Sequence, residues 1–479
     1  MTSHSDSRSR VLVMGGGLAG TLAAAAVASH CDEVVIVERH TLPDTPVPRR
    51  GLPQARHAHM LWSGGADAIE DLLPGTLGLW LDAGAHRIPL PSGMLSYSPC
   101  GWYRRWHEPR YAVDDLYLIG ASRDLIDWGV RTRLQADPRI RILTAEPLRL
   151  LGDRTRITGA VVQHGPGRQE RLHADLVIDA MGRSSRATGW LGDIGVPAIP
   201  ETTLDAGVTY ASRRYKAPAG ASGDWPAVTI QPDARIPVPG TAGSIIPIEG
   251  GTWQVALCGT RGGEPTGDPE RFEEYARHMR HSLVADFLAA AEPDSPVSLT
   301  RDTASRHRHY GKIRMPAGFL AIGDAATALN PLYGHGMSVA ALGARGLRDV
   351  ASAMGGITGP RFTRRAQREM GRPAAAAWRL AAGQDTFFTG TRGRRPTLAD
   401  RVSRAYTHRL IRTAASNFTV AEALTRVMSL QAGAGVLAHP RVLLGAIRGP
   451  LLPPLTGPPL TAEEDAVKQS PSISNLRCS

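Results

Sequence analysis

A carboxylate and closely spaced glycines occur together in the stretch GFLAIGDAATALNPLYGHGMS, residues 318–338. An apolar run at residues 319–322 predicts a short buried strand, and Asp324 follows the glycine that ends it. A turn at residues 330–336 then opens an alanine-rich helix. Glycines in such a turn let the backbone approach a flat ligand, and the free N–H groups of the first helical turn attract negative charge. The spacing therefore predicts a ligand site built from a carboxylate and a helix N-terminus.

The N-terminal residues carry a second pattern, one that can bind phosphate. Three consecutive glycines divide an uncharged run at residues 11–28 into an expected strand, 11–14, and an expected helix, 18–29, and a second strand is expected at 33–37. The glycines argue against a signal peptide or a membrane helix here. The βαβ unit carries GxGxxG at Gly15, Gly17 and Gly20, with Glu38 at the end of its second strand. This pattern is typical of a dinucleotide site, with the pyrophosphate at the helix N-terminus and the acid on a ribose.

The positive charge of this 479-residue chain comes from arginine. The formal net charge is +11, the chain has three lysines (Lys216, Lys312 and Lys468), and no run of five or six like charges occurs. This distribution argues against nucleic-acid binding and favours a solvated arginine-rich surface over a face that docks an acidic partner. The cysteines, Cys31, Cys100, Cys258 and Cys478, lack zinc-site spacing. We expect reduced thiols, no metal site, and a cytoplasmic protein without a membrane span.

Between the two glycine-rich patterns lie segments that could complete a site. Residues 49–62 are expected to form a loop leading into a helix, and residues 87–113, rich in Trp, Tyr, Pro and Gly, to form irregular strands of a cap over a pocket. The sequence SRDLIDWGVRTRL, residues 122–134, predicts an amphipathic helix with Arg123 in its first turn. A strand at residues 176–180 precedes a glycine-rich turn in HADLVIDAMGRSSR.

Residues beyond 200 change in pattern twice. Short strands are expected at residues 208–214, 227–231, 244–249 and 252–258, with a hairpin at Gly250 and Gly251 and a helix at residues 270–291. Helices are then expected beyond Pro373, at residues 374–386, 398–431 and 441–447. The Pro-rich tail, residues 450–479, is expected to be an extended arm that ends in disorder.

Three motifs stand in order along the chain: GxGxxG with Glu38, a DxxxDAxGR turn, and GD followed by PxxGxG. Together they resemble those of the group A flavoprotein monooxygenases, which share the p-hydroxybenzoate hydroxylase fold. The resemblance implies FAD as cofactor, with Asp324 accepting hydrogen bonds from ribityl hydroxyls and residues 331–337 holding the pyrimidine edge of the flavin. The residues expected to contact FAD are Gly15, Gly17, Leu18, Ala19, Gly20, Glu38, Arg39, Arg50, Arg123, Gly182, Asp324, Pro331, Gly334, Gly336 and Met337.

The predicted fold class is α/β: an FAD/NAD(P)-binding Rossmann-like domain with an inserted, mostly antiparallel β-sheet substrate domain and a C-terminal helical region. The FAD-binding domain is expected in three parts, residues 1–86, 114–200 and 301–372. The remaining segments are the cap or substrate segment 87–113, the sheet domain 201–300, the helical region 373–449 and the tail 450–479.

Four further stretches narrow the resemblance. They are RGLPQARHAH at residues 50–59, GTRGGEP at 259–265, NPLYGHGMS at 330–338 and RGPLLPP at 448–454. They resemble the flavin-dependent epoxidases of polyether antibiotic biosynthesis, the monensin and lasalocid type. This implies O₂-dependent epoxidation of alkenes in a linear, lipophilic polyketide polyene, either free or tethered to an acyl carrier protein.

The electron source stays open. Many group A enzymes have Asp before the glycine of the second motif, where this chain has Met181. NADPH or NADH is therefore expected to reduce the flavin either directly or through a separate flavin reductase. Oxygen transfer from a C4a-hydroperoxyflavin to an alkene requires no general base, so we expect a cofactor cradle without an acid or base of assigned role. His57, His59 and His335 are the candidate proton donors, and each has packing as its alternative role.

The sequence leaves four alternative functions. A flavin-dependent halogenase is expected to show WxWxIP and an active-site lysine, whereas residues 102–106 read WYRRW. An aromatic hydroxylase is the main alternative, and a polyene or isoprenoid reductase would add about two mass units rather than about sixteen. A basic protein that docks a carrier without binding flavin would show salt-sensitive binding to an acidic partner.

Overall fold

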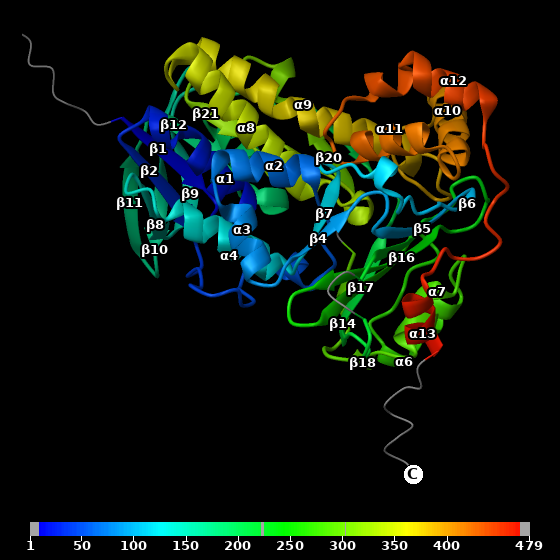
Figure 1. The fold of residues 1–479 in the computed structure, drawn as a ribbon. Coiled ribbons are helices and arrows are strands. Elements are labelled where there is room, and N and C mark those ends of the chain that lie inside the picture. The colour runs from blue at the N-terminus through cyan, green and yellow to red at the C-terminus, as the bar shows by residue number, and fades with distance from the viewer. Residues whose placement is uncertain (1–8, 222–224, 302, 470–479) are drawn as a thin grey trace, which may run out of the picture.

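The structure is a computed structural model of the chain and describes residues 9–221, 225–301 and 303–469. Figure 1 shows three parts: a layered α/β part at the left, an antiparallel sheet at the lower right and a group of C-terminal helices at the upper right. This arrangement confirms the predicted fold class.

A five-stranded parallel sheet forms the centre of the α/β part, with the strand order β21-β12-β1-β2-β8. Its strands are β1 (Arg10–Met14), β2 (Glu33–Glu38), β8 (Ile140–Thr144), β12 (Leu176–Asp179) and β21 (Phe319–Ala321). One face packs on helices α1 (Leu18–Val27) and α8 (Gly336–Met354). The other packs on an antiparallel sheet of β9 (Glu146–Gly152), β10 (Ile157–His164) and β11 (Arg168–His173). Because both faces are covered, the central strands are almost continuously apolar.

The strand register gathers the three motifs at one edge of the parallel sheet. Met14 pairs with Asp179 across β1 and β12, and Asp179 pairs with Ala321 across β12 and β21. The glycine-rich loop, Glu38, the turn after Asp179 and the Asp324 turn therefore all follow carboxyl ends of adjacent strands. That edge is where open α/β sheets bind their ligands.

The antiparallel part is an eight-stranded sheet. Its main path runs β18-β14-β17-β16-β15-β5-β6, and β19 (Ser298–Thr300) also pairs with β14. The path consists of β5 (Met94–Ser98), β6 (Gly101–Trp102), β14 (Thr209–Lys216), β15 (Ala227–Ile230), β16 (Thr241–Ile248), β17 (Thr252–Gly259) and β18 (Glu292–Pro293). Gly250 and Gly251 have φ of 72° and 64° between β16 and β17, which confirms the predicted hairpin. Strands β5 and β6 show that part of the expected cap, residues 87–113, belongs to this sheet.

Smaller elements connect these parts. One three-stranded sheet contains β3 (Leu61–Trp62), β4 (His86–Pro89) and β7 (Tyr117–Gly120), and another contains β13 (Glu201–Leu204), β20 (Ser305–Arg308) and β22 (Thr327–Ala328). The helices α2 (Ser63–Leu72), α3 (Thr76–Asp82), α4 (Arg123–Leu134) and α5 (Ala187–Asp193) lie in the α/β part. Helix α4 begins at Ser122, whose side chain caps it by accepting from the Leu125 N–H.

Two helices predicted from the sequence are too long, because each is two shorter helices in the structure. The helix expected at residues 270–291 is divided into α6 (Pro269–Arg277) and α7 (Leu283–Leu288), and the His281 ring accepts a hydrogen bond from the Leu283 N–H at the second start. The helix expected at residues 398–431 is divided into α10 (Leu398–Ala414) and α11 (Phe418–Met428), where Asn417 caps the second helix. Asn417 is a side-chain N-cap inside the second apolar pattern, whereas Ser282, the N-cap residue of α7, makes no such bond.

Two other predictions in the C-terminal part were wrong. Helix α9 runs through Pro373, from Gly359 to Asp385, instead of beginning after it. Buried side chains on both sides of the proline, such as Met370 and Ala377, pack on α8 and hold the helix together despite the missing N–H. The tail contains a helix, α13 (Ala462–Gln469), whose Glu464 accepts two hydrogen bonds from buried Arg105. The expected disordered end lies outside the described residues, as does Cys478.

Within the described ranges, no helix is long and apolar enough to cross a membrane. Cys31, Cys100 and Cys258 are free thiols. The same ranges contain no group of three or more His, Cys, Asp or Glu side chains with metal-binding geometry.

Candidate functional site

The loop between β1 and α1 can only be built with glycine. Gly15 has φ of +108°, and a Cβ there would lie 2.6 Å from the Ala180 carbonyl oxygen. A Cβ at Gly20 would lie 1.9 Å from the carbonyl oxygen of Gly15. The first turn of α1 is thereby held against β12, and the N–H groups at its start face the sheet edge. Leu18 is buried in the core, and the Ala19 methyl group faces the Asp324 turn, 2.8 Å from the position that a Cβ on Gly323 would take.

Glu38 lies beside this loop at the end of β2. Its Oε2 accepts a hydrogen bond of 2.9 Å from the Gly16 N–H, and Oε1 accepts from the His40 N–H at 3.1 Å. Arg39, the next residue, is exposed and donates to the His40 ring. The predicted acid is therefore in position, whereas the Arg39 side chain points away from the loop.

Arg49, rather than Arg50, faces the same loop. The Arg50 side chain is exposed, but that of Arg49 is only 5% exposed, and its guanidinium lies 3.9 Å from Glu38. A Cβ on Gly17 would lie 3.8 Å from the Arg49 Nη2. The sequence analysis named Arg50, whereas the structure places its neighbour Arg49 beside the glycine-rich loop.

Asp127 is a member of this group that the sequence analysis did not single out. Its Oδ1 accepts a hydrogen bond of 2.7 Å from the Arg123 Nε, and its Oδ2 lies 3.9 Å from the Arg49 Nη2. Arg123 and Asp127 are one helical turn apart on α4 and both are buried. The sequence RDLID could have predicted this ion pair, since residues at i and i+4 lie on the same face of a helix.

Two polar atoms in this group lack hydrogen-bond partners. They are the Nε of Arg49 and the Oδ2 of Asp127, and both are buried. Buried charged groups are normally hydrogen-bonded, because leaving one unsatisfied costs about 1–3 kcal/mol or more. A ligand carrying phosphate and ribose hydroxyls would satisfy both atoms next to a helix N-terminus. The residues present therefore fit the pyrophosphate and ribose portion of a dinucleotide.

The second cluster surrounds Asp324, whose side chain is 43% exposed and so can receive a ligand. Its Oδ2 lies 3.9 Å from the Arg183 Nε. Arg183 also donates to the carbonyl oxygens of Ala304 and Leu329, which ties the turn after β12 to the strand before residues 330–336. Gly182, at φ of +72°, has open space where a Cβ would point.

Asp179 occupies the motif in which many group A enzymes place an acid next to the glycine. Here it is fully buried, accepting from the Ser185 hydroxyl at 2.5 Å and from the Met181 N–H at 3.1 Å. Burial raises the pKa of Asp179 to about 6. Because its oxygens are turned toward the protein interior, this carboxylate is not available at the ligand-facing surface.

The turn at residues 331–337 exposes backbone at the predicted position. Pro331 and Gly336 are exposed, and a Cβ on Gly336 would point into open space. Gly334 has φ of +65°, and a Cβ there would lie 3.1 Å from Met60. Met337 is buried and anchors the first turn of α8 in the core. A flat ligand can therefore approach this turn without a side chain in between.

A buried network holds the turn from behind. Asp385, 1% exposed at the end of α9, accepts from the Tyr333 hydroxyl at 2.7 Å and from the Asn330 side chain at 3.1 Å. Asn330 in turn accepts from the Leu332 N–H at 3.1 Å. Burial raises the pKa of Asp385 to about 6. The sequence gave no signal for this residue, because nothing local marks an aspartate at a helix end as a partner of a turn 52 residues earlier.

The three candidate histidines are poorly suited to carry a proton near neutral pH. Burial lowers the pKa of His57 to about 4, of His59 to about 3 and of His335 to about 4. The His57 ring bridges the hydroxyls of Ser212 and Thr300, both at 2.8 Å, and the His335 ring is bonded to the Met428 carbonyl at 2.9 Å. These hydrogen bonds favour packing and positioning roles for His57 and His335 over proton donation.

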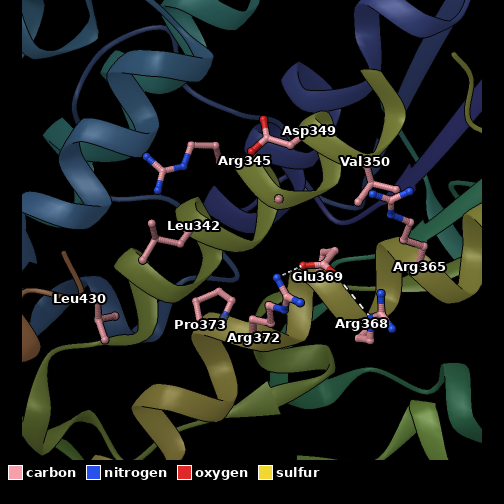
Figure 2. Close-up of a pocket in the computed structure, with 11 residues that line it drawn as sticks. Leu342, Arg345, Asp349, Val350, Arg365, Arg368, Glu369, Arg372, Pro373 and Leu430 are labelled. Carbon is pink, nitrogen blue, oxygen red and sulfur yellow. Dashed lines mark ion pairs between the residues drawn. The ribbon is translucent and has the colours of Figure 1, made fainter. Parts of the chain in front are cut away.

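A hollow of about 550 Å³ lies elsewhere, between α8 and α9 (Figure 2). Arg345, Arg365, Arg368 and Arg372 line it together with Asp349 and Glu369. The Glu369 carboxylate pairs with Arg372 at 2.6 Å and with Arg368 at 3.4 Å. None of the predicted cofactor-contacting residues lines this hollow, so it is separate from the cradle described above.

Known proteins include relatives of this chain at less than 30% identity. No protein-family profile matches the chain. It is 28% identical over 400 residues to Protein Rv3254 of Mycobacterium tuberculosis, covering 80% of this chain and 81% of that protein. It is 26% identical over 356 residues to the kynurenine 3-monooxygenase of Salinispora arenicola, covering 70% of each chain.

Solved structures are similar in fold at low identity. The myxobacterial chondrochloren halogenase CndH, a variant of the FAD-dependent halogenases, superposes with a TM-score of 0.61 at 16% identity, covering 88% of this chain and 97% of that one. PqsL of Pseudomonas aeruginosa, described as "a probable FAD-dependent monooxygenase", gives 0.57 at 17% identity, covering 79% and 97%. The chain therefore has the fold of FAD-dependent monooxygenases and halogenases.

Proposed function

We propose that this protein is an FAD-dependent monooxygenase. The observation that carries the proposal is the pair of unsatisfied buried atoms, on Arg49 and Asp127, beside a helix N-terminus that a dinucleotide would occupy. The sequence similarity to kynurenine 3-monooxygenases supports the class of reaction. The fold shared with the FAD-dependent proteins CndH and PqsL supports the cofactor.

Bound FAD would supply the activation of O₂ and the transfer of one oxygen atom. The chain would supply the cradle. Glu38, Arg49 and the start of α1 would hold the ribose and pyrophosphate, and Asp324 would accept from the ribityl hydroxyls. The N–H groups at the start of α8 would favour negative charge on the pyrimidine edge of the ring.

As substrate we propose a lipophilic polyene, epoxidised at one or more alkenes. The sheet face next to the flavin-binding turn supports this, because Leu332 of the turn packs on an apolar cluster there. That cluster consists of Ala206, Val208, Tyr210, Ala242, Cys258 and Phe388. These side chains are buried and uncharged, so this side of the turn favours an apolar substrate over a charged one. A polyene delivered by an acyl carrier protein belongs to the same proposal.

Aromatic hydroxylation is the second candidate, and one specific observation favours it. The Tyr333 hydroxyl of the turn donates to the buried Asp385 carboxylate at the end of α9, and the pKa of Asp385 is raised to about 6. Such a pair could accept the proton of a phenol, which alkene epoxidation does not require. The kynurenine 3-monooxygenases, at 26% identity, act on an aromatic substrate by name.

Halogenation has less support despite the fold similarity. Lys216 pairs with Glu292 at the edge of the antiparallel sheet, and Lys468 pairs with Asp465 in α13. Lys312 is exposed after β20. No lysine in the described ranges contacts the flavin-binding turn, where a halogenase would need one.

For electron supply we propose a separate flavin reductase. Met181 occupies the position where an acid would help to join the flavin and nicotinamide sites, and Asp179 is buried with its oxygens engaged. Direct reduction by NADPH or NADH is the alternative. Stopped-flow reduction of the purified FAD-bound protein by each nicotinamide would distinguish the two.

The test is accurate-mass analysis of a linear polyene ester after incubation with the protein, FAD, a nicotinamide donor, a flavin reductase and air. A product about sixteen mass units heavier per oxygen, absent without O₂ and absent with Asp324→Ala, supports epoxidation once NMR excludes allylic alcohols. An oxygenated phenol or aniline with no product from the polyene supports aromatic hydroxylation. Failure of the purified chain to bind FAD would overturn the proposal.

A further inference from the structure

Exposed apolar side chains are concentrated in the C-terminal helices. The described part of the chain contains twelve large apolar side chains that are exposed, and seven of them lie between residues 398 and 452. Five fall within the ten residues 443–452 and are Leu443, Leu444, Ile447, Leu451 and Leu452. Single exposed leucines are ordinary on protein surfaces, but such a cluster marks an interaction site.

Helix α12 (Pro440–Arg448) presents most of this cluster. Its inner side packs through Val442, Gly445 and Ala446 against the neighbouring helices, so that Leu443, Leu444 and Ile447 face outward. Ile447 is 75% exposed and Leu451, just beyond the helix, is 63% exposed. Figure 1 places α12 at the outer edge of the molecule.

The outward orientation is fixed by contacts on the inner side. The Arg409 side chain of α10 donates to the carbonyl oxygens of Ala446 at 2.6 Å and Ile447 at 2.9 Å. The hydroxyl of Ser416 accepts from the N–H groups of Leu451 at 3.0 Å and Leu452 at 3.2 Å. The apolar side chains cannot turn inward without breaking these bonds, so their exposure is built into the fold.

The surroundings of the cluster are basic. Arg441 and Arg448 lie two helical turns apart on the same side of the apolar face of α12, and both are exposed. Within residues 401–461 the sequence contains seven arginines and one acid, Glu422. The Glu422 carboxylate is already paired with Arg426 at 3.0 Å. The face therefore combines protruding leucines with uncompensated positive charge.

We propose that α12 and residues 451–452 form a surface that docks onto an anionic phospholipid membrane. A helix with an outward apolar face and arginines along one edge of it lies in the headgroup region, with the apolar side chains among the acyl chains and the guanidinium groups on lipid phosphates. We call the residues Arg441, Leu443, Leu444, Ile447, Arg448, Leu451 and Leu452 the docking face. This inference is independent of the proposed function, although a membrane is where lipophilic molecules accumulate.

A second copy of the chain fits the same surface less well. In a twofold dimer the same patch would meet itself, which would bring Arg441 and Arg448 close to their own copies. No acid of residues 401–461 other than the already paired Glu422 is present to offset that repulsion. The lipid phosphates of an anionic bilayer supply the missing negative charge.

The test is co-sedimentation of the purified full chain with vesicles. We expect stronger binding to vesicles with about 30% phosphatidylglycerol than to pure phosphatidylcholine, and weaker binding at high salt. Arg441→Gln with Arg448→Gln should lower the partition coefficient roughly fivefold for each arginine removed. Leu444→Gln with Ile447→Gln should lower it by more than about tenfold.

Matched control variants lie on other surfaces. Ile236→Gln with Val238→Gln alters two exposed apolar residues of a loop, and Arg168→Gln with Arg171→Gln alters two exposed arginines of β11. Both controls should bind vesicles as the wild type does. Equal binding by the docking-face variants and the wild type would overturn the proposal. So would a lipid-free dimer, seen by light scattering, that Leu444→Gln with Ile447→Gln dissociates.

Discussion

The Asp385 carboxylate accepts a 2.7 Å hydrogen bond from the Tyr333 hydroxyl, so the last residue of α9 holds the turn that precedes α8. The same carboxylate accepts from the Asn330 side chain, and the turn is therefore fixed at two points. Since the side chain is buried, its charge has few partners besides these two donors. The position of the turn and the ionisation of Asp385 are consequently linked.

Replacing Asp385 by Asn should change how stability depends on pH. Burial raises the pKa of Asp385 from 3.8 to about 6, so the folded state favours the protonated form. The penalty for ionising it is absent below pH 4, grows as pH rises to 6 and is then constant, at about 3 kcal/mol. Relative to the wild type, Asp385→Asn should become more stable by up to about that amount between pH 4 and pH 7. Urea unfolding at several pH values measures this, and parallel curves for the two proteins would contradict it.

The adjacent arginines offer a matched pair for the cofactor site. Arg49→Ala should lower FAD affinity by about tenfold to a hundredfold, because a charged hydrogen bond contributes about 1.5–3 kcal/mol. Arg50→Ala should change affinity less than about twofold, since its side chain is exposed and points away from the loop. Fluorescence titration of the apoprotein with FAD compares the variants. A larger loss from Arg50 than from Arg49 would restore the original sequence-based assignment.

The proposed cofactor site shows which features the sequence predicts and which it does not. The βαβ unit and Glu38 were predictable because a glycine-rich loop, a strand end and a helix start lie within 29 residues and follow local rules. The same rules located the loop that contains Arg49. They could not predict which of its two adjacent arginines is buried, because side chains in an irregular loop do not alternate with a regular period. Asp385 was beyond reach, since its role depends on tertiary packing of α9 on α8.

Helix ends show the same limit. The apolar pattern over residues 270–291 continues through the break between α6 and α7, which it does not reveal. Pro373 lies inside a helix that packing on α8 holds together. In the tail, the sequence of α13 is mostly polar, but its Val467 side chain is buried in the apolar cluster of the antiparallel sheet. At Pro373 and in the tail, contacts with distant elements outweigh the local propensity on which the predictions relied.

Asp324→Ala should separate cofactor binding from folding. Its carboxylate is partly exposed and its charged neighbour, Arg183, is 3.9 Å away, so the free energy of unfolding should change by less than about 0.5–1 kcal/mol. FAD affinity should fall by about tenfold or more, because the hydroxyl-binding acceptor is lost. Asp193→Ala, at the exposed end of α5, is the control. Wild-type FAD affinity with Asp324→Ala would remove this residue from the site.

His335 should make the protein sensitive to acid. Burial lowers its pKa from 6.5 to about 4, so the folded state favours the neutral ring. The contribution of His335 to stability is present above pH 6.5 and is lost as pH falls toward 4, by up to about 3 kcal/mol. His335→Gln should reduce the fall in unfolding free energy over this range. The catalytic pH profile, by contrast, should show no ionisation from His57, His59 or His335 between pH 5 and pH 8.

Two glycines of the proposed FAD site make a direct test. An added Cβ would clash with protein atoms at Gly20 but would meet open space at Gly336. A Cβ at Gly20 would lie 1.9 Å from the Gly15 carbonyl oxygen, so Gly20→Ala should lower stability by about 3 kcal/mol or more. At Gly336 no atom lies within 4 Å of the new methyl group, and alanine is a better helix former by about 1 kcal/mol, so Gly336→Ala should fold at least as well as the wild type.

The same Gly336 methyl group would project into the space in front of the turn, where the flavin ring is proposed to lie. FAD affinity of Gly336→Ala should therefore fall by more than about tenfold while its thermal stability without FAD is unchanged or higher. Gly189→Ala on α5, also with open space around the added Cβ, should leave FAD affinity near wild type and thermal stability unchanged or higher. If Gly336→Ala bound FAD as tightly as the wild type, the ring would have to lie elsewhere, and the carboxylate of Asp324 would lose its proposed partner with it.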